Sequence, residues 1–178
     1  MHYVLRLALL IFCYLLPLEL VAQEKIELEH MVLTDGVDRN TRQFKNKLAS
    51  PVRGKKAYLW MQLRGSAALL EELKLSKLGS LPIRHAWYKY QSDEISAETP
   101  DTLSLSVDLS VGRKDALQKL SYELAADGAF SWRVWSGKEQ LSSGWWRVDL
   151  TYENGDPVLC PTADNKRKAC RFSFEVKR

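Results

Sequence analysis

Apolar and polar residues alternate along several short stretches of this chain, a two-residue period that is typical of strands with one buried face. The clearest case is the stretch 130–150, FSWRVWSGKEQLSSGWWRVDL, which holds four of the six tryptophans. Both of its ends alternate, and the SGK and SSG segments between them are rich in turn-forming residues. This pattern predicts a β-hairpin with a long connection, around which the rest of the fold is organised.

The alternation divides the side chains of this hairpin between two faces. The uniformly apolar face, which is predicted to line the core, consists of Phe130, Trp132, Val134, Trp146, Val148 and Leu150. The mixed face combines indoles with charges and consists of Ser131, Arg133, Trp135, Trp145, Arg147 and Asp149. Guanidinium groups stack on indole rings, so the mixed face is either a self-satisfied ladder or, in part, an open binding surface. We expect Trp145 to be exposed and Trp135 to be partly buried.

Similar patterns predict the other strands, and in one place the period changes to that of a helix. Strands are expected at residues 26–34, 57–64, 83–90, 103–111 and 171–176. Leucines at helical spacing in residues 66–79 predict a short amphipathic helix, capped by Ser66 and ended by Gly79. Residues 112–129 fit either a helix or a strand, and the strand is the preferred interpretation because Asp127 and Gly128 favour a turn.

These elements indicate the fold class. About seven short alternating strands predict an all-β fold, an immunoglobulin-like antiparallel β-sandwich with a short inserted helix. The chain has 178 residues, of which 46% are hydrophobic and 27% charged, and this suits a single soluble domain with a substantial core. The net charge of +4 is too mild for a dedicated nucleic-acid-binding protein.

The N-terminal residues 1–22 carry a different pattern, which predicts a secretory signal peptide. An unbroken apolar run over residues 7–16 is ended by Pro17, and a small residue offers a cleavage point before Gln23. The alternative is an uncleaved membrane anchor, which the proline disfavours because a spanning helix needs about 20 apolar residues. We therefore expect one mature domain, residues 23–178, in the periplasm or secreted.

Two cysteines remain in the mature chain, Cys160 and Cys170. An even number of cysteines after a secretory signal predicts a disulfide in an oxidising compartment. Metal binding is the weaker interpretation, because two cysteines without a nearby histidine fall short of the usual four ligands. A basic stretch, residues 39–64, contains lysines and arginines but no acid and is typical of a solvated loop, although it can also meet an anionic surface.

Motifs of enzyme chemistry are missing from the sequence. There is no G-x-S-x-G, no P-loop, no G-x-G-x-x-G and no H-E-x-x-H. The histidines of the mature chain, His30 and His85, each fall inside a predicted strand rather than beside a nucleophile. We therefore expect a non-enzymatic protein without cofactor or metal, and a hydrolase is the weaker alternative.

Several motifs resemble those of a bacterial family, the domain of unknown function 2914. They are AYLWMQLRG at 57–65, HAWY at 85–88, WRVWS at 132–136, GWWRVD at 144–149 and FEV at 174–176. The resemblance covers roughly residues 26–176, although the segments 66–79 and 112–129, the loop after Tyr90 and the cysteine pair look like additions to the family pattern. It implies a compact β domain exposed in the bacterial envelope and no established activity.

The sequence thus predicts a binding or interaction domain of the envelope. Its ligand would be a glycan or peptidoglycan, stacked on exposed indoles, or a protein partner anchored by tryptophan and arginine. Indole area combined with fixed positive charge suits acidic sugars or an anionic protein patch. The candidate ligand-binding residues are Arg133, Trp135, Trp145, Arg147 and, if its strand is a neighbour, Trp87. The alternative function is a membrane-anchored accessory subunit of an envelope complex, in which the N-terminal segment alone contacts the membrane.

Overall fold

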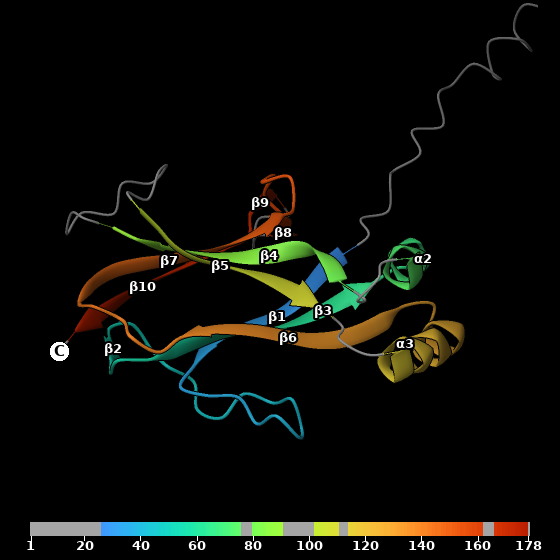
Figure 1. Ribbon diagram of the computed structural model, residues 1–178, viewed down its shortest axis with the longest axis horizontal. Coiled ribbons are helices and arrows are strands. Elements are labelled where there is room, and N and C mark those ends of the chain that lie inside the picture. Colours follow the sequence, from blue (N-terminus) through green and yellow to red (C-terminus); the bar gives the residue numbers. More distant parts are fainter. Residues whose placement is uncertain (1–25, 76–79, 91–101, 111–113, 162–165, 178) are drawn as a thin grey trace, which may run out of the picture.

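The computed structural model describes residues 26–75, 80–90, 102–110, 114–161 and 166–177 of the chain. Within these residues the chain forms strands and two helices (Figure 1). In chain order the elements are β1 (Ile26–Thr34), β2 (Val52–Arg53), β3 (Ala57–Gly65), α2 (Ala67–Leu75), β4 (Ser80–Lys89), β5 (Thr102–Ser110), α3 (Lys114–Asp127), β6 (Phe130–Lys138), β7 (Gly144–Tyr152), β8 (Leu159–Pro161), β9 (Arg167–Ala169) and β10 (Arg171–Lys177).

Most of the strands belong to two antiparallel sheets that face each other across a shared core (Figure 1). The smaller sheet has the strand order β1-β3-β6, and the larger has the order β2-β10-β7-β4-β5, in which only the short β2 runs parallel to its neighbour β10. Strands β8 and β9 form a separate hairpin. The helices α2 and α3 contact each other at one end of the sheets. The prediction of a mostly antiparallel β fold is therefore confirmed.

The predicted central hairpin is wrong, because its two strands lie in different sheets. Strand β6 pairs with β3, whereas β7 pairs with β4 and β10. The connection 139–143 therefore crosses from one sheet to the other. Packed sheets are about 10 Å apart, a distance that a few extended residues span. Two amphipathic strands bury their apolar faces equally well side by side or face to face, so alternation alone does not distinguish these arrangements.

The predicted core face of the two strands is confirmed. Each of its six side chains is at most 5% exposed, namely Phe130, Trp132, Val134, Trp146, Val148 and Leu150. Those on β6 point toward the larger sheet, and those on β7 point back toward the smaller one. Burial of large aromatic and aliphatic side chains at this interface is the main stabilising contribution that the sequence provides.

The helix at residues 66–79 is confirmed in the part that the structure describes. Helix α2 covers Ala67–Leu75 and buries Leu69, Leu70 and Leu73, and the Ser66 hydroxyl accepts a hydrogen bond from the Leu69 amide at 3.5 Å. The predicted end at Gly79 lies outside the described residues.

The prediction of a strand at residues 112–129 is wrong, because the described part of this segment forms the helix α3 (Lys114–Asp127). Leu120 is buried, while Tyr122, which a strand would place on the same face, is 68% exposed. The Asp127-Gly128 pair ends the helix instead of forming a hairpin turn. Gly128 has a φ of 69°, and its amide donates to the Leu124 carbonyl at 2.9 Å, as in a glycine C-cap.

The predicted apolar face of residues 103–111 is only partly correct. Leu109 is buried, but Leu103 is 54% exposed. The pairing of β5 with β4 shifts register where Trp87 faces Leu105 and Tyr88 faces Leu103. This bulge turns the first part of the edge strand β5 outward, and an extra residue of this kind is not visible in an alternating pattern.

The N-terminal residues 1–22, which carry the predicted signal peptide, lie outside the described residues. Neither α2 nor α3, the helices of the described chain, is long and apolar enough to cross a membrane.

Candidate functional site

The disulfide between Cys160 and Cys170 is confirmed, with the two Cα atoms 5.0 Å apart. It links β8 to the residue that precedes β10, and thereby fastens the β8-β9 hairpin to the larger sheet. A disulfide of this kind is typical of an oxidising, extracellular environment.

Replacing both cysteines by serine is expected to lower the free energy of unfolding by about 3 kcal/mol, because the crosslink closes a short loop in the unfolded chain. Urea denaturation of the oxidised protein and of the double variant measures this difference. Reductant should destabilise only the oxidised protein. Reactive thiols at Cys160 and Cys170, found after unfolding without reductant, would contradict the pairing.

The residues of the predicted binding surface do not form one surface. Arg133 and Trp135 lie on the outer face of the smaller sheet, because their neighbours in β6 point into the core. Trp145 lies in β7 of the larger sheet, where Trp146 and Val148 point into the core, and it is half-buried, so the prediction that it is exposed is wrong. The two halves are therefore on opposite sides of the sandwich, and the sequence-based assignment of one common face is wrong.

Trp87 is part of the core and does not extend an exposed surface, so its assignment as a ligand-binding residue is wrong. Its side chain is fully buried, and its indole Nε1 donates a hydrogen bond to the Ser136 hydroxyl at 2.8 Å. The ring of Phe174 meets it edge to face, with the ring centres 6.3 Å apart. Strand β4 is a central strand of its sheet, and the face that carries Trp87 points toward β6 across the core.

A buried polar chain joins the two sheets at this point. The Ser136 hydroxyl, which accepts from Trp87, lies 2.7 Å from His85 Nδ1, and His85 Nε2 lies 3.0 Å from the Met61 sulfur. All these groups are satisfied if Ser136 donates to Nδ1 and the proton of a neutral imidazole sits on Nε2. Burial lowers the pKa of His85 to about 3, so the ring is neutral at physiological pH. We interpret this serine–histidine pair as a structural link between the sheets, because neither residue is accessible to a substrate.

On the outer face of β7 the Arg147 guanidinium contacts a carboxylate and tyrosines, and not indoles as the ladder interpretation expects, while Arg147 Nε and Asp149 Oδ1 are buried without a hydrogen bond among the described residues. Arg147 is only 4% exposed, and its guanidinium makes an ion pair with Asp149 at 2.9 Å. It also donates to the Tyr90 hydroxyl at 3.4 Å and lies over the ring of Tyr88 at 5.3 Å. Burial raises the pKa of Asp149, against the opposing effect of Arg147 and Arg171. This half of the predicted surface therefore fixes the sheet rather than presenting charge to a ligand.

The outer face of the smaller sheet is partly covered by the basic loop between β1 and β2 (Figure 1). Trp60 is buried under this loop and donates from Nε1 to the Arg42 carbonyl at 2.8 Å. Phe44 meets the Trp60 ring edge to face at 5.1 Å, and the Arg42 guanidinium lies 5.5 Å from the Trp135 ring. The loop that the sequence predicts to be solvated thus packs on indoles, and it leaves Trp135 half-buried.

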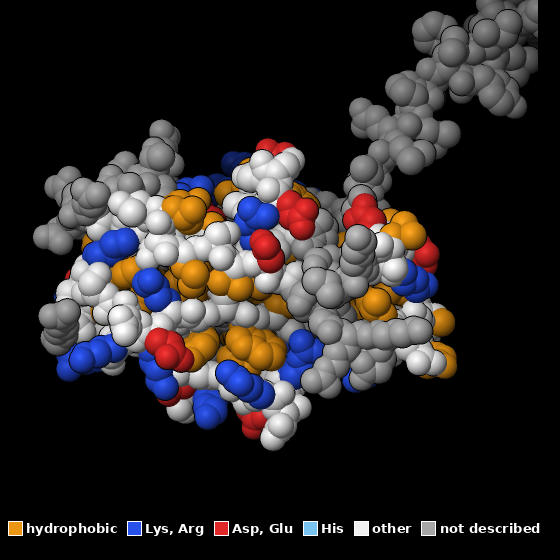
Figure 2. Space-filling model, viewed as in Figure 1, with side chains coloured by type: hydrophobic (Ala, Val, Ile, Leu, Met, Phe, Trp, Pro, Cys, Tyr) orange, Lys and Arg blue, Asp and Glu red, His pale blue; other side chains and the backbone are white. Residues whose placement is uncertain are grey.

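Beside this loop lies a concave cavity of about 360 Å³, which we call the α3–β6 groove. Its lining residues are Arg42 of the loop, Gln62 of β3, Ala116, Lys119, Leu120 and Glu123 of α3, and Ser131, Trp132 and Arg133 of β6. Two smaller hollows extend it along β6, one sharing Arg42 and including Trp135, the other sharing Glu123 and Ser131. Figure 2 shows hydrophobic side chains at the surface over the middle of β6, with lysine and arginine side chains beside them.

The α3–β6 groove has more hydrogen-bond donors than acceptors. The Arg133 guanidinium makes no hydrogen bond or ion pair within the described part of the chain, and its Nε is buried without an acceptor. The indole Nε1 of Trp132 is also buried without an acceptor among these residues. Lys119 lies 3.9 Å from Glu123, a contact that is largely exposed and therefore weak. Arginine and tryptophan can only donate, so a ligand that complements this groove must supply acceptor oxygens.

The sequence indicated only part of this groove. The alternation of β6 predicts Arg133 and Trp135; Arg133 lines the groove, and Trp135 lines one of its extensions. Lys119 is not among the predicted site residues, because the sequence analysis favours a strand over residues 112–129, although the leucine spacing there indicates the helix that places Lys119 at the groove. The contribution of Arg42 has no local signal, since it depends on a loop that folds over a sheet distant in sequence.

A comparison with protein-family models and with curated proteins finds no match for this chain. Membership of the 2914 family therefore stays a prediction from the motifs.

Proposed function

We propose that the protein is an exported, non-enzymatic binding domain, and that it binds a carboxylate-bearing sugar of a glycan in the α3–β6 groove. The observation that carries this proposal is the unpaired guanidinium of Arg133 in a concave, donor-rich site. A buried or half-buried charge without a partner is costly, and a ligand carboxylate would relieve that cost.

The chemistry of the groove supports an acidic sugar. A guanidinium fork matches the two oxygens of a carboxylate, and Lys119 adds positive charge at the same rim. Gln62 and Ser131 offer polar groups for hydroxyls, although both also bond to Glu29. The volume of 360 Å³ falls in the range of about 300–1,000 Å³ that is typical of small-molecule sites.

The pattern of exposed hydrophobic residues favours a small ligand over a broad protein interface. The large exposed apolar side chains of the described residues are Leu75, Leu103, Tyr122 and Leu159, which belong to four different elements. A protein interface predicts instead a contiguous apolar patch. Export is supported by the apolar N-terminal run and by the disulfide.

The strand order supports the finer assignment of an immunoglobulin-like sandwich. Strands β1, β3 and β6 form one sheet. In the other sheet β10, β7 and β4 are consecutive neighbours. This is the order in which immunoglobulin-like domains place strands A, B and E opposite strands G, F and C. Trp87 on β4 then takes the position of the buried tryptophan on strand C.

The test is a glycan array with the protein produced from the full-length chain, followed by calorimetry on an oligosaccharide that it retains. We expect retention of glycans containing uronic or muramic acid and not of their neutral counterparts. Arg133→Gln should weaken binding about 10- to 100-fold, the magnitude of charge-assisted hydrogen bonds.

The variant Arg53→Gln is the matched control, since this exposed arginine of β2 does not line the groove. Because Arg133 has no partner in the described chain and its unpaired charge is costly, Arg133→Gln should not lower the free energy of unfolding. Equal binding of acidic and neutral glycans, or unchanged affinity in Arg133→Gln, would refute the proposed site. Selective capture of an acidic protein without any glycan would assign the groove to a protein partner instead.

A further inference from the structure

A second cavity lies at the opposite edge of the smaller sheet, and at about 610 Å³ it is larger than the α3–β6 groove. Its lining residues are Leu28 and Met31 of β1, the disulfide pair Cys160 and Cys170, Lys168 and Ala169 of β9, and Arg171 of β10. Strands β1 and β6 are the two edges of their sheet, so this cavity shares no lining residue with the groove. We call it the disulfide cavity.

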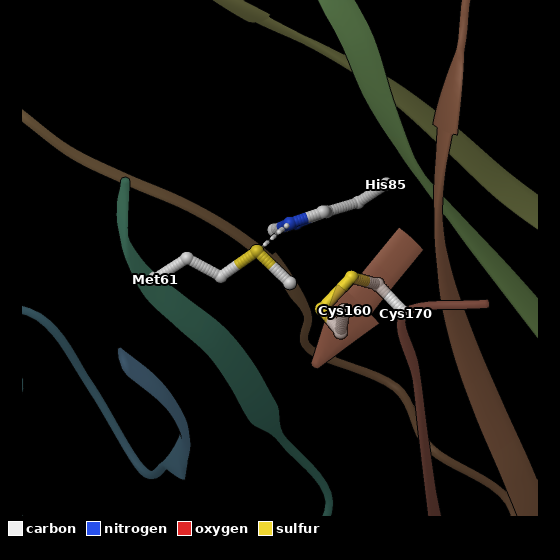
Figure 3. The surroundings of a disulfide bond; sticks show 4 residues. All are labelled: Met61, His85, Cys160 and Cys170. Carbon is white, nitrogen blue, oxygen red and sulfur yellow. Dashed lines mark hydrogen bonds between the residues drawn. A yellow bond between two sulfur atoms is a disulfide. The ribbon is translucent and has the colours of Figure 1, made fainter. Parts of the chain in front are cut away.

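The walls of the disulfide cavity are apolar and held in place. Leu28 and Met31 are half-buried on the edge strand, and the disulfide lines the same cavity. Cys170 is 2% exposed and belongs to the core, where Met61 and His85 lie in the surroundings of the disulfide (Figure 3). A crosslinked wall that is anchored in the core keeps the cavity preformed, so a ligand would not have to order it.

Positive charge lies at the rim of these apolar walls. Lys168 is exposed, and its ammonium group has no hydrogen bond or ion pair in the described part of the chain. Arg171 is partly exposed and lies 3.8 Å from the Asp149 carboxylate. No acidic side chain is among the described residues that line the cavity. The complementary ligand therefore combines an apolar body with a negative end.

We propose that the disulfide cavity binds a monomeric anionic amphiphile, an aliphatic chain that ends in a carboxylate. The chain packs against Leu28, Met31 and the disulfide, and the carboxylate lies at Lys168 and Arg171. A single chain fits better than a bilayer surface, because the apolar residues line a concavity and not a protruding face. This site is independent of the glycan site.

The test is calorimetric titration with saturated monocarboxylates of increasing length, below their micelle concentrations, on protein produced from the full-length chain. Affinity should rise about fourfold for each added methylene until the cavity is filled. Alcohols of the same length should bind about two- to fivefold more weakly than the carboxylates, and Lys168→Gln should remove most of this difference. Lys56→Gln, an exposed lysine that does not line the cavity, is the matched control.

Ala169→Trp is designed to fill the cavity and should abolish binding of the whole series, with folding checked by circular dichroism and disulfide content. Arg133→Gln should leave the series unchanged, so failure here and failure of the glycan site are distinguishable. The proposal would be overturned by an affinity that does not depend on the length of the aliphatic chain. It would also be overturned if Lys168→Gln and Lys56→Gln bound the series equally and neither preferred carboxylates over alcohols. Binding to phosphatidylglycerol vesicles without binding of any monomer would also overturn it.

Discussion

Replacing Trp87 by alanine is expected to lower the free energy of unfolding by about 3–5 kcal/mol, the range for large aromatic side chains removed from a packed core. The side chain has no exposed surface, and its ring contacts Phe174 edge to face. The substitution also removes the donor to Ser136, which is the meeting point of the polar chain between the sheets. Loss of packing volume and loss of a buried hydrogen bond therefore act together.

Urea denaturation, followed by circular dichroism, measures this effect. Trp145→Ala is the matched control, because Trp145 is half-buried on the outer face of β7 and should lose less than half as much stability. Trp87→Phe keeps most of the ring but not the donor, and is expected to fall between alanine and the native residue. A loss below about 1 kcal/mol in Trp87→Ala would contradict its place in the core.

The alternation of apolar and polar residues correctly predicts which side chains face the core, but it does not predict which strands pair. It placed Trp132 and Val134 of β6, and Trp146 and Val148 of β7, in the core, where the structure has them. The same alternation wrongly predicts that β6 and β7 pair as one hairpin and that their outward residues share one surface. Burial of an apolar face is a property of one strand, whereas pairing depends on hydrogen bonds to segments distant in sequence, such as β3 and β4. Sheet membership is therefore the step that local patterns do not determine.

The predicted binding surface is only partly correct, because the sequence shows which way a side chain points but not what lies beside it. Arg133 lies in the α3–β6 groove because period two places it outward, and this much follows from the sequence. Arg147 points outward by the same rule. It is nevertheless enclosed by Asp149, by Tyr88 of β4 and by Tyr90, which directly follows β4. Whether an outward arginine is open or enclosed depends on neighbouring strands, and the sequence does not show them.

Acidification is expected to destabilise the fold through His85. Burial lowers its pKa to about 3 in the folded protein, while in the unfolded chain it returns to about 6.5. Between these values the unfolded state binds a proton that the folded state does not, so the free energy of unfolding falls as the pH falls. The slope approaches about 1.4 kcal/mol per pH unit well between these two pKa values, and it fades as the pH rises through 6.5, where the unfolded ring also becomes neutral.

The measurement is a series of urea denaturation curves between pH 7 and pH 4 for the native protein and for His85→Gln, which has no titrating group at this position. Three carboxyl groups also lose stabilising contributions in acid, because their pKa values are lowered in the folded protein. Hydrogen bonds lower the pKa values of Asp35 and Asp38. Burial raises the pKa of Glu29, but hydrogen bonds from Ser131 and Gln62 outweigh this effect and lower it. These carboxylates are present in both proteins, so their effect cancels in the difference between the curves.

The variant His85→Gln is expected to be less stable at pH 7, because glutamine fills the place of the imidazole ring poorly, but its free energy of unfolding should fall less steeply as the pH falls. Parallel curves for the two proteins would show that His85 can accept a proton in the folded state, which the closed contact with Ser136 and Met61 does not allow.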